Sequence, residues 1–420
     1  MTRARLRAAA RRILRAGLAA VAPGPLVRAH LRASGIGGRL EKASRVFVVA
    51  VGKAAVPMAR AVHKVLGRRI TSAILIAPSE APPLPRTRNF IAGHPIPNRA
   101  GARAAAAVIR LLDEAGRGDV VLLLLSGGAS ALMPAPIGGV SLRDKQRITR
   151  LLLRRGATID EMNAVRKRLS RLKGGGFARL AAPARVIALA LSDVPGNDPG
   201  VIGSGPAVED PRAATRARRV IRRLLKESEI PAGVAKALRR AGARKPQGSV
   251  ASTRVIGSGQ TFARAAAKKA RELGFSVSLL IGGLRGEARI CGTEIVARFL
   301  EVRGGRRLCL IATGETVVKV RGRGRGGRNQ ELALSSAAAL GRLKRPVALA
   351  AFATDGVDGN STAAGGIVDH RTAARAVVLG ISIRESLDRN ASNAALGRLG
   401  GLIQTGPTLT NVADLALVLG

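Results

Sequence analysis

Short apolar runs alternate along this chain with amphipathic segments of helical period. The runs at 45–51, 72–77, 119–125 and 186–191 have the length and composition of strands buried on both faces. Segments such as 54–66, in which apolar residues recur every three or four positions, lie between them. Strands that alternate with helices predict a doubly wound α/β architecture.

The same pattern predicts the remaining elements and a division into two domains. The polar stretch 242–249 contains Gly and Pro and predicts a linker, so we expect domains over residues 1–241 and 250–420. In the first, further helices are expected at 103–115, 142–154 and 161–172, and as two basic helices within 212–241. In the second, strands are expected at 253–257, 276–281, 307–313, 317–320 (as a hairpin) and 346–353, with helices at 262–273, 287–300 and 330–340.

The N-terminal segment is rich in Arg and Ala, contains no acidic residue, and fits two interpretations. That composition is typical of an organellar transit peptide. However, Leu6, Ile13, Leu14 and Leu18 keep helical spacing up to Pro23, and the chain continues without a break. This favours the first helix of the fold.

The charge balance is extreme, with 71 Lys and Arg against 26 Asp and Glu, a formal net charge of +45. Such a field attracts nucleic acid, anionic lipid or anionic substrates. The basic residues are spread along the chain, and without Trp or Tyr the aromatic platforms of single-strand binders are scarce. We therefore favour an enzyme with an Arg-rich surface, and the one kind of nucleic-acid binding that we leave open is non-specific and through charge.

Cysteine content and hydropathy bear on the compartment. Cys291 and Cys309 are too few for a disulfide framework and lack metal-ligand spacing, so we expect both to be core residues of a cytoplasmic protein. No apolar run approaches the length of a membrane span. We expect no membrane partner, and we include a homodimer among the expected assemblies.

Two of the predicted strands end in glycine-rich loops suited to phosphate. Glycine lets backbone amides approach an anion closely, and a lysine at a helix start adds positive charge. Taken alone, a Gly-Lys pair is more often a surface feature, and here it lacks the spacing of a Walker motif. A hydrolase nucleophile elbow would need Gly-x-Ser-x-Gly and a partner histidine, which SGGASA does not supply. The expected phosphate ligands are Gly52, Lys53, Ser126, Gly127, Gly128 and Ser130.

Carboxylates follow two other predicted strands. Asp193 and Asp198 come after the strand at 186–191, where they are placed to hold a magnesium ion that bridges phosphate oxygens. The alternative is a turn in which an aspartate caps the next helix. Asp355 and Asp358 follow the strand at 346–353 and suit a metal or a substrate hydroxyl.

An Arg-Gly segment, RGRGRGGRNQE, occupies residues 321–331. Its guanidinium groups, including those of Arg323, Arg325 and Arg328, could clamp phosphate oxygens with fixed geometry. An RNA-binding Arg-Gly tail is the competing interpretation. Because the arginines run directly into Asn-Gln-Glu and a predicted helix, the pattern is typical of an ordered loop.

Eight motifs in order, over nearly the whole chain, resemble the MOFRL-type glycerate 2-kinases. They are VGKAA, GHPIPN, SGGASAL, DKQRITRLLLRRGATIDEMNAVRKRLSRLKGGG, SDVPGNDPGVIGSGP, GETVVKVRGRGRGGRNQELAL, ATDGVDG and TGPTLTNVADL. The resemblance implies a Rossmann-like N-terminal domain and a smaller α/β C-terminal domain. It also implies ATP- and Mg²⁺-dependent phosphorylation of D-glycerate at its 2-hydroxyl, which gives 2-phosphoglycerate.

The resemblance further implies roles for the matching residues. Lys53 and either Arg328 or Arg325 are the expected catalytic cations. Asp193 is expected to bind the metal or to orient the substrate hydroxyl, with Asp198 in support. The remaining expected contacts with substrate or nucleotide are Asn163, Arg166, Lys167, Gly314, Glu315, Asn329 and Asp355.

Two other functions stay open. A hydroxypyruvate reductase needs Gly-x-Gly-x-x-Gly after a strand, and the nearest pattern, at 322–327, follows a short charged hairpin instead. A catalytically degenerate kinase-like scaffold would bind RNA or another polyanion through its charge. Asn197 and Ala391, which stand where the family usually has an acid, keep this interpretation open.

Overall fold

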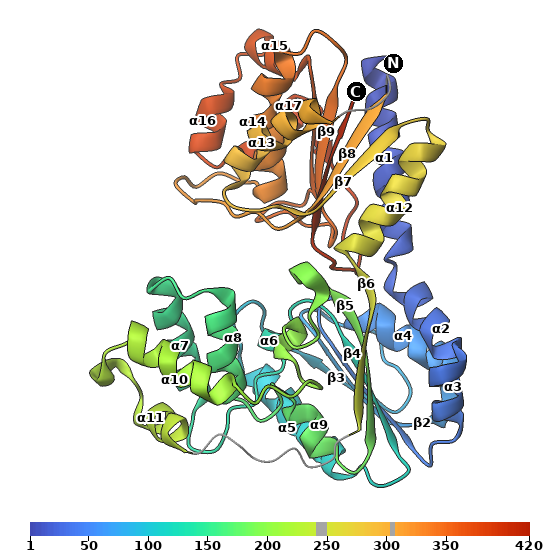
Figure 1. Ribbon diagram of the computed structural model, residues 1–420, viewed down its shortest axis with the longest axis vertical. Coiled ribbons are helices and arrows are strands. Elements are labelled where there is room, and N and C mark those ends of the chain that lie inside the picture. Colours follow the sequence, from blue (N-terminus) through green and yellow to red (C-terminus); the bar gives the residue numbers. More distant parts are fainter. Residues whose placement is uncertain (241–249, 303–306) are drawn as a thin grey trace. The chain divides into compact units, whose positions relative to one another are not determined.

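The structure, a computed structural model, describes residues 1–240, 250–302 and 307–420 as two compact units (Figure 1). The first-sheet unit is Pro23–Ile256, and the second-sheet unit joins Met1–Ala22 to Gly257–Gly420. The expected linker at 242–249 lies outside the described residues. The division differs from the expected domains because the first helix packs with the second unit and the strand after the linker joins the first sheet.

The first sheet has six strands in the order β3-β2-β1-β4-β5-β6. The strand pairs from β3 to β5 are parallel. This is the strand order of dinucleotide-binding α/β folds, so the doubly wound, Rossmann-like expectation is confirmed. The strands are β1 (Val46–Val51), β2 (Ile70–Ala77), β3 (Thr87–Ile91), β4 (Val120–Leu125), β5 (Arg185–Ser192) and β6 (Ala251–Ser258).

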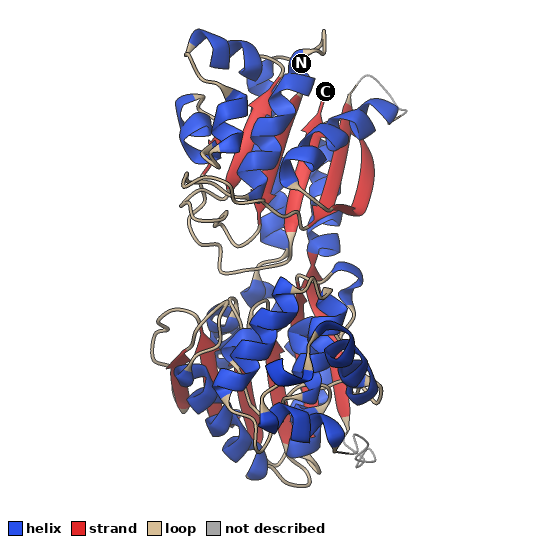
Figure 2. Cartoon of the chain, turned by 90° about the vertical axis from the view of Figure 1, so that its left-hand side faces the viewer, coloured by secondary structure: helices blue, strands red, loops and turns tan. Residues whose placement is uncertain are grey.

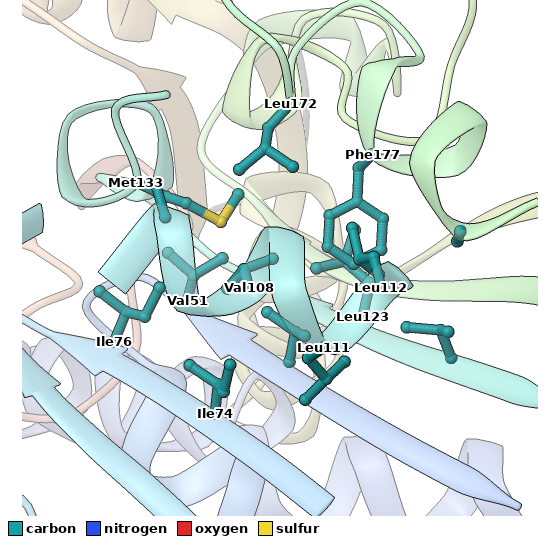
Figure 3. Packing of buried hydrophobic residues seen from close by; sticks show 14 of the residues in the cluster. Val51, Ile74, Ile76, Val108, Leu111, Leu112, Leu123, Met133, Leu172 and Phe177 are labelled. Carbon is teal, nitrogen blue, oxygen red and sulfur yellow. The ribbon is translucent and has the colours of Figure 1, made fainter. Parts of the chain in front are cut away.

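Helices cover both faces of this sheet (Figure 1). Because side chains alternate along a strand, Val51, Ile74 and Leu123 reach the face where Val108 and Phe177 pack (Figure 3). The helices are α2 (Pro23–Arg32), α3 (Ser34–Glu41), α4 (Ala55–Leu66), α5 (Arg99–Asp113), α6 (Ala129–Leu132), α7 (Leu142–Arg154), α8 (Ile159–Arg168), α9 (Gly176–Ala181), α10 (Ala213–Leu224) and α11 (Ala232–Arg239). Single 3-10 turns are η1 (Gly67–Arg69), η2 (Pro195–Asn197), η3 (Ile202–Ser204) and η4 (Glu227–Glu229).

The second sheet is mixed, in the order β11-β10-β9-β12-β8-β7. Its β7 and β8 are parallel, and the other pairs are antiparallel. The strands are β7 (Ser276–Leu284), β8 (Leu308–Gly314), β9 (Ala348–Ala353), β10 (Gly365–Asp369), β11 (Leu402–Ile403) and β12 (Asp414–Leu419). The prediction of a hairpin strand at 317–320 is wrong. Val317 and Val320 are exposed, and β8 pairs instead with β12 from the end of the chain.

Helices also lie on both sides of the second sheet (Figure 2). Helices α1 and α12 contact one face, while α13 and α14 pack in the core on the other. Both cysteines are buried here and free, as expected. The helices are α1 (Arg3–Ala20), α12 (Gly259–Glu272), α13 (Ala288–Glu301), α14 (Arg328–Gly341), α15 (Thr372–Val378), α16 (Ile383–Asp388) and α17 (Ser392–Arg398).

The interpretation of the N-terminal segment as a helix of the fold is confirmed. Gly17 lies so close to the Phe262 ring that an added Cβ would come within 2.3 Å of it. Arg7 donates to the buried carboxylate of Asp369 at 2.7 Å. Among the described residues, no helix combines the length and the apolar character needed to cross a membrane.

Candidate active site

The strand order brings two predicted phosphate loops together. Strand β1 lies between β2 and β4, so the connections leave it in opposite directions, and ligands of such sheets bind beyond the carboxyl ends at this switch point. The loop after β1 contacts the loop after β4 there. The amide of Lys53 donates to the Gly127 carbonyl at 2.9 Å, and the amide of Ala54 donates to Ser126 Oγ at 3.0 Å.

The glycines of these loops are required by geometry. Gly52 has φ +132°, and a Cβ on it would lie 2.1 Å from Ser126 Oγ. Gly128 has φ +88°, a conformation that side chains rarely adopt. Among the described residues, no backbone acceptor receives the amides of Gly127 and Gly128. These amides are therefore candidates to bind an anion.

Ser130 and Asn163, two of the expected ligands, meet through Ser204. The hydroxyls of Ser130 and Ser204 are 3.1 Å apart, and Ser204 donates to Asn163 Oδ1 at 3.2 Å. Lys173 Nζ donates to the Ser130 carbonyl at 2.6 Å and also to its hydroxyl. The loop after β4 is thus tied to α8 and η3.

The neighbouring cations Arg166 and Lys167 differ in their surroundings. Lys167 donates to Asp210 at 2.6 Å, so its ammonium holds the chain locally instead of facing a ligand. Arg166 is half-buried, and burial lowers its pKa. Lys167 is therefore paired within the protein, whereas no ion pair of Arg166 is found among the described residues.

The carboxylates after β5 also differ. Asp193 is half-buried at the strand's end. Asp198 is exposed, and its Oδ1 accepts the Gly200 amide at 2.7 Å. This hydrogen bond forms a local turn, which was the alternative to a metal-binding role. The described residues contain no group of three or more His, Cys, Asp or Glu side chains that could hold a metal ion.

In the second-sheet unit, Arg328 is engaged within the protein. Its guanidinium donates to both oxygens of the buried Asp414 and pairs with Glu315, another expected ligand. Burial raises the pKa of the Asp414 carboxyl to about 7, and the charge of Arg328 opposes that rise. Gly314 has φ +149° and packs against the Leu284 carbonyl, so it shapes the turn into Glu315.

The acids of TDGVDG stabilise local structure. Asp358 is buried and accepts the backbone and side-chain amides of both Asn329 and Gln330, which caps the start of α14. Asn329, an expected ligand, is therefore held by Asp358. Asp355 is half-buried, and its Oδ1 accepts the Val357 amide at 3.2 Å.

The Arg-Gly segment is an ordered loop, as predicted. Asn390 Oδ1 accepts the amides of Arg321 and Gly322 at 2.6 and 2.8 Å. An added Cβ on Gly322 would come within 2.3 Å of the Arg389 carbonyl, whereas the side chain of Arg325 is exposed. The glycines thus face the protein and leave alternate arginines in solvent.

Lys145 is a candidate that the sequence analysis missed. It lies on α7 and is only 9% exposed, and its Nζ has no hydrogen-bond partner among the described residues. Burial, together with the charge of Arg166, lowers its pKa to about 8. The signal was in the sequence: Lys145, Ile148 and Leu152 share the buried face of the helix.

The strand order and the strand-end loops define a protein of the Rossmann-like α/β class. Residues 9–239 match a family described as a domain of unknown function (DUF4147), and residues 308–414 match the MOFRL family. The chain is 41% identical to the D-glycerate 2-kinase of Thermotoga maritima, over 89% of this chain and 90% of that protein. It belongs to the MOFRL-type glycerate 2-kinase family.

A solved structure and a relative with a different name are also similar to this chain. The crystal structure of glycerate kinase from Thermotoga maritima matches with a TM-score of 0.89 and 38% identity, and 99% of each chain is covered. A protein of Agrobacterium vitis named putative hydroxypyruvate reductase is 39% identical over 89% of this chain and 99% of its own length.

Proposed function

We propose that this chain transfers the γ-phosphoryl group of ATP to the 2-hydroxyl of D-glycerate, giving 2-phosphoglycerate and ADP. The observation that carries the proposal is the meeting of the Lys53 loop with the Gly127 loop at the switch point of the sheet. Phosphoryl transfer depends mainly on positioning and charge neutralisation, which two such loops supply. Relatives named glycerate 2-kinase and glycerate kinase support the choice of substrate.

The proposed roles follow from the chemistry of the transfer. The hydroxyl oxygen of glycerate attacks the γ-phosphorus, the bond to the ADP oxygen breaks, and the hydroxyl proton passes to a carboxylate. Lys53 and the amides of Gly127 and Gly128 would bind phosphoryl oxygens. Asp193, half-buried after β5, would orient the hydroxyl and accept its proton. For Arg325, the resemblance to the family is the ground on which we propose a role as a catalytic cation.

Magnesium fits the residues that follow β5. Asp193 carries a carboxylate of the kind that Mg²⁺ prefers, and Mg²⁺ usually takes one or two carboxylates and completes its shell with water and substrate phosphates. Asp198 can contribute only the oxygen that does not accept the Gly200 amide. When bound, the ion would neutralise charge on the phosphate oxygens.

The reductase name of one relative is a weaker guide. A dinucleotide fingerprint uses its glycines for close approach to the pyrophosphate. In the segment 322–327, the space next to Gly322, Gly324 and Gly327 is filled by the protein's own atoms at Arg389, Ala391 and Asp358. These glycines therefore do not leave the open space that a dinucleotide fingerprint provides for the pyrophosphate.

An ADP-release assay with D-glycerate, hydroxypyruvate or tartronate semialdehyde, each with and without Mg²⁺, tests the proposal. We expect turnover with D-glycerate and Mg²⁺ only. ADP release with another acceptor and not with D-glycerate would overturn the substrate assignment. No ADP release with any acceptor, together with salt-sensitive binding of RNA, would support the degenerate scaffold instead.

A further inference from the structure

Three basic side chains from different segments of the first-sheet unit interact electrostatically, and one of them contacts the loop that follows β4. Lys145 belongs to α7, Arg166 to α8, and Lys173 to the turn after α8 (Figure 1). Helix α7 packs on α8, and α8 and α6 both pack on η3. Lys173 Nζ holds Ser130 of α6, which in turn contacts Ser204 of η3.

Among the described residues, no acid is found to act on the charges of Lys145, Arg166 or Lys173. Burial lowers the pKa of Lys173 well below its usual value, and the charges of Lys145 and Arg166 lower it further. The nearby carboxylate of Asp210 is already paired with Lys167 and Arg216. A buried charge without a partner is unfavourable, so a protein that keeps one usually has a use for it.

The position of Lys173 is fixed by the backbone around it. The amide of Gly174 donates to the Ser204 carbonyl at 3.0 Å, and the amide of Gly175 donates to the Gly205 carbonyl at 2.8 Å. Gly174 and Gly175 both have positive φ, which explains the glycine run after the lysine. The cation cluster is therefore attached to the same loops that bear the candidate phosphate and metal ligands.

We propose that Lys145, Arg166 and Lys173 form a buried oxyanion site that binds a carboxylate or phosphate group of the reactants, an assignment that rests on the proposed function. Lys145 Nζ, buried and unpartnered among the described residues, is its open donor. Lys173 donates to Ser130, and the hydroxyls of Ser130 and Ser204 border the cluster. An arriving oxyanion would replace the water that these ammonium groups lose on burial.

The test compares the Lys145→Met variant with the wild type by calorimetric titration with D-glycerate and, separately, with ADP. We expect the variant to bind one of the two ligands at least tenfold more weakly. Weaker binding of D-glycerate would assign the site to its carboxylate, and weaker binding of ADP would assign it to a phosphate. The matched control is Arg147→Met, which removes an exposed cation from the same helix and should leave both affinities within twofold. Unchanged affinities in Lys145→Met would overturn the site.

The melting temperature without ligand distinguishes this role from a structural one. Removing an unpartnered buried charge should raise the melting temperature of Lys145→Met above that of the wild type, although ligand binding weakens. A variant that melts below the wild type, or fails to fold, would show that Lys145 stabilises the fold and would overturn the site.

The kinase assay separates this inference from the proposed function. If the wild type binds a ligand through Lys145 but releases no ADP with D-glycerate, the proposed function fails and the site stands. If the wild type turns over and Lys145→Met keeps the same KM for both substrates, the site fails and the proposed function stands.

Discussion

At the scale of single residues, the two candidate arginines of the 321–331 loop have different surroundings. Arg328 neutralises the buried Asp414 and pairs with Glu315, whereas the Arg325 side chain is exposed. An arginine held by two carboxylates stabilises its surroundings, and its charge is already balanced. We therefore propose Arg325, of the two, as the catalytic cation.

This difference predicts opposite effects for two substitutions. Arg328→Met leaves Asp414 buried without its partner and should cost about 3 kcal/mol of unfolding free energy. Arg325→Met should change stability by less than about 0.5 kcal/mol and lower kcat at least tenfold. Urea unfolding and ADP release measure both effects. Full activity in Arg325→Met would show that Arg325 is not catalytic and would leave Arg328 as the candidate.

The lowered pKa of the buried Lys145 side chain predicts that the stability of the protein depends on pH. Burial depresses its pKa to about 8 in the folded protein, with Arg166 adding to the effect and Lys173 shifted in the same direction. Between about pH 8 and 10, the unfolded chain therefore binds more protons than the folded protein, and the free energy of unfolding rises with pH. The stability gained at high pH is lost as the pH falls through about 8. Without ligand, wild-type stability should rise by about 1 kcal/mol per pH unit between pH 8 and 9, relative to Lys145→Met. Parallel pH profiles for the two proteins would contradict this.

The sequence predicted the strand-end loops better than the buried charged side chains beside them. Lys53, Ser126 and the paired glycines could be predicted because each follows a continuous apolar strand. Lys145 was missed because it lies among other charged residues, and only its helical spacing from Ile148 marks it as buried. The pairing of Lys167 with Asp210 spans 43 residues, which no local pattern reports.

At the scale of secondary structure, the long apolar strands of the first sheet were predictable, whereas the buried strands β10 and β12 of the second sheet and the edge strand β3 were missed. Strands β1, β4 and β5 are continuous apolar runs, and their expected bounds differ from the observed ones by one residue at most. Strand β3 was missed because its residues are polar or half-exposed at the edge of the sheet. The hairpin expected at 317–320 failed because β12, from the end of the chain, takes that place beside β8.

The start of α14 gives a prediction at this scale. Asp358 accepts hydrogen bonds from Asn329 and Gln330, so Asp358→Ala removes the cap and leaves buried donors unsatisfied. We expect a loss of about 2–4 kcal/mol in the stability of the second-sheet unit. Hydrogen exchange of the α14 amides should accelerate accordingly. Unchanged exchange would show that Asp358 is available for a metal or substrate, as the sequence analysis expected.

At the scale of the whole molecule, the chain builds the second-sheet unit from both of its ends. Helix α1 contributes Gly17 against Phe262 and Arg7 against Asp369. Sequence patterning found the helix but not its place, because contacts between residues 7 and 369 leave no local periodicity.

This arrangement predicts how the chain can be divided. A fragment of residues 23–256 contains a complete sheet and should unfold cooperatively on its own. A fragment of residues 257–420 should not, because it lacks α1, and fusing residues 1–22 to it should restore folding. Circular dichroism melts of the two fragments and the fusion check this. A cooperative transition in the 257–420 fragment alone would contradict the division.

The identity of the product tests the central claim most directly. Phosphorus NMR of the wild type incubated with ATP, Mg²⁺ and D-glycerate should show ADP and 2-phosphoglycerate, since the proposed transfer is to the 2-hydroxyl. The Lys53→Ala variant should fold normally but slow the reaction at least a hundredfold, because a cation at the phosphates is lost. Formation of 3-phosphoglycerate, or full activity in Lys53→Ala, would contradict the account.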